Sequence, residues 1–131
     1  MSVESFDPSA ASAKVDAGAI ERLLEAASQD APEFGLSALE RANFAGLMNQ
    51  PPGVWLEAAE ALSATQAEAL IRFFTLAEEA ISGWQAGAKS PVIALAKALK
   101  ARGEYPRELT AWIKANTSNR FLPHGSLMDR L

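Results

Sequence analysis

The chain has 131 residues, no cysteine and a formal net charge of −4 at pH 7. This length suits one domain with a single hydrophobic core, and the absence of cysteine excludes disulfides, thiol catalysis and thiolate metal sites. No apolar run approaches the roughly 18 residues that a membrane-spanning helix needs. These features predict a cytoplasmic, bacterial-type protein without a membrane segment.

Alanine dominates the composition. The chain has 27 Ala residues but only four Val, five Ile and four Thr. Alanine is the best helix former because it loses no side-chain entropy in a helix, whereas strands are rich in β-branched residues. The composition therefore predicts an all-α fold.

Three helical segments are expected in the first half of the chain. Asp16 is placed to cap a helix that runs to about residue 28. A second helix is predicted for about 37–49, where a capping box precedes an apolar set that includes Leu39. A turn with two prolines then leads into a short third helix at about 54–62.

The fourth segment, after Ser63, has the clearest helical pattern. Glu78 and Glu79 are expected on its solvated side, as is usual for acidic pairs in Ala-rich amphipathic helices. Its inward positions recur at a spacing of three or four residues: Ala67, Leu70, Ile71, Phe74, Ala77 and Ile81.

Two more helices follow. Ser90 and Pro91 have the residue types preferred at the N-cap and first position of a helix, and Gly103 is typical of a helix end. Pro106 is expected to open a sixth helix that ends near Ala115. Together with an aperiodic start, 1–14, the pattern predicts an irregular or orthogonal bundle of about six helices.

The termini differ from the body of the chain. Residues 1–14 are predicted to be a flexible leader, and 15–131 one helical domain. The segment after residue 116 has no helical period, yet it contains large apolar groups at Phe121 and Leu122. We therefore expect an ordered, non-helical C-terminal segment.

A catalytic site is not recognisable in the sequence. The chain has one histidine, His124, so it cannot form a cluster of His metal ligands, and no nucleophile elbow or phosphate-cradling loop is present. The sequence predicts a non-enzymatic protein without a metal or cofactor.

Charged residues are distributed unevenly along the chain. Residues 1–88 contain four basic and thirteen acidic residues, a net −9, whereas residues 89–131 contain eight basic and three acidic residues, a net +5. This division indicates either internal neutralisation or an anionic partner for the C-terminal third. The candidate binding residues of the last two helices are Lys97, Lys100, Arg102, Arg107 and Lys114.

The loop 119–126 is a second candidate. It combines its apolar groups with Asn119, Arg120 and His124, and two interpretations remain open for it. The loop either closes the base of the bundle or presents Arg120 and His124 to a partner.

The tryptophans complete the set of candidates. Trp55 and Trp112 lie on apolar stripes and are expected in the core. Trp84 lies between Gly83 and Gly87, so we predict partial exposure and a role as an interface anchor.

The sequence thus predicts a binding or regulatory module that contacts a protein partner or a second copy of itself. It would do so through Trp84, the basic C-terminal helices and the loop 119–126. The alternative is a nucleic-acid-binding protein that uses the helix-turn-helix-like pair at 90–115, although the net charge of −4 disfavours it. The third hypothesis is a small-ligand pocket between helices.

Overall fold

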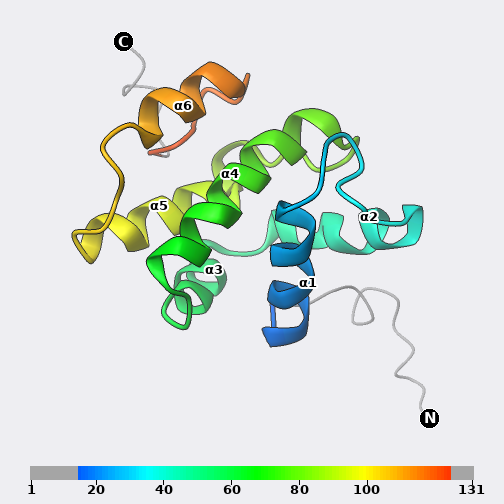
Figure 1. Ribbon diagram of the computed structural model, residues 1–131, viewed down its shortest axis with the longest axis horizontal. Helices are drawn as coiled ribbons and strands as arrows, with labels where there is room; N and C mark the ends of the chain where they lie inside the picture. The colour runs from blue at the N-terminus through cyan, green and yellow to red at the C-terminus, as the bar shows by residue number, and fades with distance from the viewer. Residues whose placement is uncertain (1–14, 125–131) are drawn as a thin grey trace.

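The computed structural model describes residues 15–124, which form an all-helical bundle without a strand. A long central helix, α4, has α1 and α2 on one side and α3 and α5 on the other (Figure 1), while α6 packs against α4. The predicted irregular bundle is confirmed; the predicted leader, 1–14, lies outside the described residues. The helices are α1 (Ala17–Ala27), α2 (Ala38–Phe44), α3 (Pro52–Ala59), α4 (Ala64–Ala80), α5 (Pro91–Ala101) and α6 (Leu109–Asn116).

The helix starts follow the predicted caps. The Asp16 carboxylate accepts a hydrogen bond of 2.8 Å from the backbone N–H of Ala19. Ser37 and Ser63 each form a complete capping box with the residue three positions later. Ser90 caps α5 by accepting from the N–H of Val92. These bonds satisfy N–H groups that lack a partner within the helix.

An aromatic cluster lies at the centre of the core. The Phe74 ring packs edge-on against Trp55, with centroids 5.3 Å apart, and lies 5.2 Å from Phe73. Phe73 in turn contacts Phe34 at 5.0 Å and Trp84 at 5.9 Å, both edge-on. All five rings are buried, so α4 joins the surrounding elements through aromatic contacts.

The second predicted helix is shorter than expected. It ends at Phe44 and continues as a 3₁₀ segment, Ala45–Asn49, whose tighter turn brings Leu47 and Met48 into the core. The carbonyl of Leu47 accepts a 2.9 Å hydrogen bond from the Trp55 indole. Helix α2 buries no side chain, and Leu39, one of its apolar residues, is 71% exposed.

The connection between α5 and α6 is longer than predicted. Gly103 has a φ of +71° and ends α5, with the N–H of Glu104 bonded to the carbonyl of Leu99 at 2.9 Å. Helix α6 begins at Leu109 rather than at Pro106, which leaves a loop at 102–108 instead of the three- or four-residue turn of a helix-turn-helix. Helix α6 packs against α4.

None of the helices in the described range, 15–124, has the length and apolar character required to cross a lipid bilayer.

Candidate functional site

A groove runs between α3 and α5. It consists of two adjacent hollows, of about 260 and 450 Å³, which share Leu56 and Lys97 in their walls. We call this feature the α3–α5 groove. From α3 and α5 it is lined by Trp55, Leu56, Ala59, Glu60, Ile93, Ala94, Lys97, Ala98, Ala101 and Arg102, and from the flanking segments by Ala88, Lys89, Ser90 and His124.

The spacing of small residues on α5 explains why the groove is hollow. Ile93, Lys97 and Ala101 follow one another at intervals of four, with Ala94 and Ala98 beside them, so one face of the helix lines the whole groove. The alanine side chains fill little space. An 11-residue helix such as α5 is about 16 Å long, which sets the length of the groove.

Basic side chains line the rim of this apolar floor. Lys97 is exposed at the middle of the groove, and Lys89 and His124 stand at one end. The Lys100 ammonium contacts Nδ1 of His124 and lies 5.2 Å from the centre of the Tyr105 ring. The structure therefore brings together Lys97, Lys100 and His124, three of the predicted binding residues.

Arg102 closes the other end of the groove. Its Nη1 donates to the carbonyl of Leu62 at 3.0 Å, beyond the C-terminal end of α3. Its Nε pairs with the Glu104 carboxylate at 2.9 Å. A guanidinium with these contacts links α5 to the end of α3, so Arg102 has a structural role that the sequence did not indicate.

The C-terminal segment is fixed by the carboxylate of Glu79. This carboxylate accepts from the Ser118 N–H at 2.9 Å and from the Ser118 hydroxyl at 2.9 Å. The Asn119 side chain donates to the carbonyl of Gly87 at 3.0 Å and accepts from the N–H of Phe121 at 2.9 Å. The described part of the predicted loop is ordered and non-helical, as expected, while residues 125 and 126 lie outside the described range.

Glu78 lies in the interior, contrary to the prediction of a solvated position. It is 2% exposed, and its carboxylate accepts from the Ser90 hydroxyl and, at 3.4 Å, from the Asn119 amide. Burial raises the pKa of Glu78 to about 7, although hydrogen bonds from Ser90 and Asn119 favour the ionised form. The sequence did contain a sign of this burial, because Glu78 lies four residues after Phe74 and three before Ile81, on the same face of the helix.

Trp84 is also buried, so its predicted exposure is wrong. It is 0% exposed, and its indole N–H donates to the carbonyl of Arg41 at 2.8 Å. Gly83, with a φ of +91°, turns the chain after α4 so that the indole returns toward the core.

Trp55 is buried as expected. Trp112 is only partly buried and lies against Arg72, whose guanidinium carbon is 4.8 Å from the ring centre.

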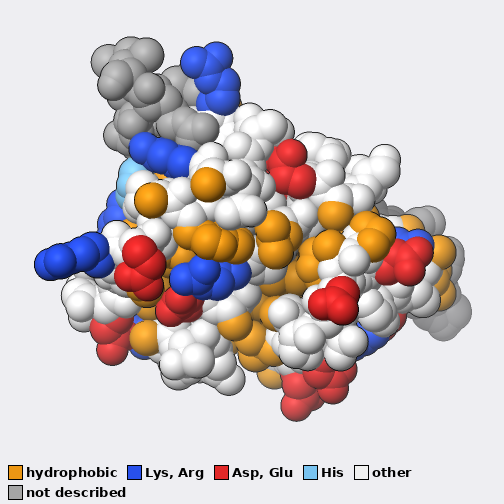
Figure 2. All heavy atoms as spheres, turned by 45° about the horizontal axis from the view of Figure 1, so that its top comes forward, with side chains coloured by type: hydrophobic (Ala, Val, Ile, Leu, Met, Phe, Trp, Pro, Cys, Tyr) orange, Lys and Arg blue, Asp and Glu red, His pale blue; other side chains and the backbone are white. Residues whose placement is uncertain are grey.

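The remaining predicted residues do not join the groove. Arg107 is exposed and Lys114 is half-buried on α6. Asn119 and Arg120 line a separate hollow of about 440 Å³ beside Glu79 and Phe121. On the face drawn in Figure 2, most basic side chains lie toward the left, and acidic side chains lie mainly below and to the right of them, around a band of hydrophobic groups.

Among residues 15–124, no three His, Asp or Glu side chains are grouped so that they could hold a metal ion. No protein family, curated protein or solved structure matches the chain.

Proposed function

We propose that the protein is a non-enzymatic docking module of the bacterial cytoplasm that binds an acidic, amphipathic helix of a protein partner in the α3–α5 groove. The observation that supports this proposal is the continuity of the groove. Its apolar floor runs the length of α5, with Lys97 at the middle of the rim.

The dimensions and charge of the groove suit a short helix. A floor about 16 Å long matches three turns of helix, whose apolar residues at i, i+3, i+4 and i+7 form a single stripe. Lys89 and Lys97 would attract acidic residues of the partner beside that stripe. Glu60 is the only acidic residue among the described residues that line the groove, so it alone would repel them. The apolar contact supplies affinity, and the rim charges set orientation and the rate of encounter.

The Lys97→Glu variant is expected to weaken binding of an acidic amphipathic peptide by about tenfold or more, because it replaces attraction with repulsion at the middle of the groove. The probe is a synthetic helix of about four turns, with Leu on one face and Glu on the other. Fluorescence anisotropy of the labelled peptide at several salt concentrations measures the affinity.

Arg107→Glu is the matched control, since it makes the same change of charge at an exposed residue outside the groove. Equal losses in the two variants would show that only net charge matters and would contradict groove binding. Tight binding of duplex or single-stranded DNA in place of the peptide, with a steep dependence on salt, would favour the nucleic-acid alternative.

A further inference from the structure

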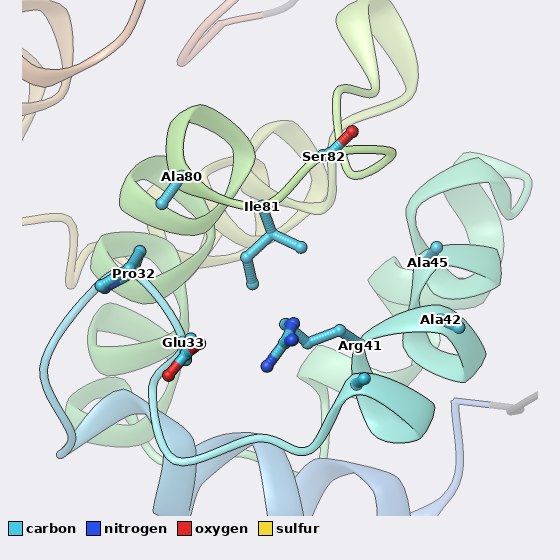
Figure 3. Close-up of a pocket in the computed structure, with 9 residues that line it drawn as sticks. Pro32, Glu33, Arg41, Ala42, Ala45, Ala80, Ile81 and Ser82 are labelled. Carbon is cyan, nitrogen blue, oxygen red and sulfur yellow. The ribbon is translucent and has the colours of Figure 1, made fainter.

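Another hollow lies on the opposite side of the molecule's central helix, between α2 and the end of α4. Its volume is about 420 Å³, and none of its lining residues belongs to the α3–α5 groove. Figure 3 shows walls from three places: the loop before α2, one face of α2 with the start of its 3₁₀ continuation, and the end of α4 with the residues that follow it. We call it the Arg41 pocket; it is lined by Pro32, Glu33, Ala38, Arg41, Ala42, Ala45, Ala80, Ile81 and Ser82.

Arg41 supplies a cation with free donors. Its guanidinium extends from α2 into the space below Ile81 (Figure 3). One nitrogen, Nη1, donates to the carbonyl of Leu36, and Arg41 forms no ion pair with any residue in the range 15–124. A guanidinium has five N–H donors in a planar fork, so most of them remain for a carboxylate ligand.

An anionic group lies across the pocket from Arg41. Glu33 is exposed on the loop, and its carboxylate accepts no hydrogen bond from the described part of the chain. The pocket also adjoins the C-terminal end of α4, where the helix dipole favours a positive charge. Ile81 and the alanines provide the apolar surface between these charges.

The loop that forms one wall is held in place before any ligand arrives. Phe34 has a φ of +54°, which is unusual for a residue other than Gly, and is nevertheless 2% exposed against Phe73. Arg22 donates to the carbonyl of the next residue, Gly35, at 2.9 Å. A wall fixed in this way requires little ordering on binding, and backbone outliers cluster at binding sites.

We infer that the Arg41 pocket binds a free α-amino acid with an apolar side chain, independently of the docking groove. The ligand carboxylate pairs with the Arg41 fork, and its ammonium lies between Glu33 and the end of α4. Its side chain packs on Ile81 and Ala42. A ligand with both charges pairs with the Arg41 guanidinium and with the Glu33 carboxylate. A ligand with a single charge leaves one of these two groups without a partner.

Three probes that share the leucine side chain but carry different charged groups test this inference by nuclear magnetic resonance titration of the ¹⁵N-labelled chain. L-leucine carries both charges, N-acetyl-L-leucine only the carboxylate and L-leucinamide only the ammonium. We expect leucine to shift the amide signals of Ala42, Ala80 and Ser82, and to bind about tenfold or more tightly than either of the others. Absence of binding, equal binding of all three, or shifts confined to the α3–α5 groove would overturn the inference.

Two variants locate the site without removing Arg41, whose bond to Leu36 contributes to the fold. Ala42→Leu fills the pocket from an exposed position, and Glu33→Gln removes the partner of the ammonium. Each is expected to weaken leucine binding by about tenfold. Leu39→Ala lies on α2 like Ala42 but outside the pocket, so it should leave leucine binding unchanged. Unchanged binding in the first two variants contradicts the assignment.

Discussion

Phe74→Ala is expected to lower the free energy of unfolding by about 3–5 kcal/mol, because the lost ring leaves a cavity that its rigid neighbours cannot fill. Phe74 is 0% exposed and lies among Trp55, Phe73 and Trp84. These aromatic neighbours come from α3, α4 and the turn after α4. Truncation therefore loosens three elements at once.

Urea unfolding followed by far-ultraviolet circular dichroism measures this loss. Leu39→Ala is a suitable control, because Leu39 is 71% exposed and surface substitutions usually change stability by less than about 0.5 kcal/mol. A loss below about 1 kcal/mol for Phe74→Ala would mean that the centre of the core has been wrongly placed.

Glu78→Gln should stabilise the protein at pH 8 by about 3 kcal/mol and leave its stability near pH 4.5 almost unchanged. The pKa of Glu78 rises from 4.5 to about 7 on folding, chiefly through burial. Between these values the folded chain binds a proton that the unfolded chain does not. The stability from this group is present below pH 4.5 and is lost as the pH rises to about 7. Glutamine stays neutral throughout, so the variant avoids this loss.

Glu79→Gln is the matched control for this effect. The neighbouring Glu79 is exposed, and the hydrogen bond from the Ser118 N–H lowers its pKa, so its dependence on pH has the opposite sign. Denaturant curves at pH 4.5 and pH 8 for the wild type and both variants give the comparison. Equal pH dependence in the wild type and Glu78→Gln would contradict the assignment of a buried carboxyl group.

The helical content and most helix starts could be predicted because they depend on local sequence. Ser37, Ser63 and Ser90 cap their helices through residues within three positions, so short-range spacing was sufficient. The end of the second helix was harder to place. Its 3₁₀ continuation brings Leu47 and Met48 into a core formed by residues distant in the sequence.

Long-range pairing explains the errors at Trp84 and Glu78. Trp84 follows a glycine that usually marks an exposed turn, but its indole N–H reaches the carbonyl of Arg41, 43 positions earlier. Glu78 is acidic in an Ala-rich helix, and its burial depends on Ser90 and Asn119. Neither set of partners is visible in a short window of sequence.

The candidate groove was predictable only in part. The basic residues Lys97 and Lys100 and the tail residue His124 were selected from charge and position, and the structure brings them together. The hollow itself depends on how closely α3 approaches α5. That distance is set by the packing of both helices, which residue spacing on either one does not determine.

Helix α2 has a consequence for the dynamics of the protein. Its seven residues bury no side chain, and a helix of two turns is not stable by itself. It is attached by the Trp84 indole and by Arg22, whose hydrogen bond is the main cause that lowers the pKa of Glu40 to about 2. The amide protons of α2 are therefore expected to exchange with solvent through local opening, whereas those of α4 exchange only when the whole protein unfolds. Because α2 forms one wall of the Arg41 pocket, an occupant there would slow exchange along the whole helix.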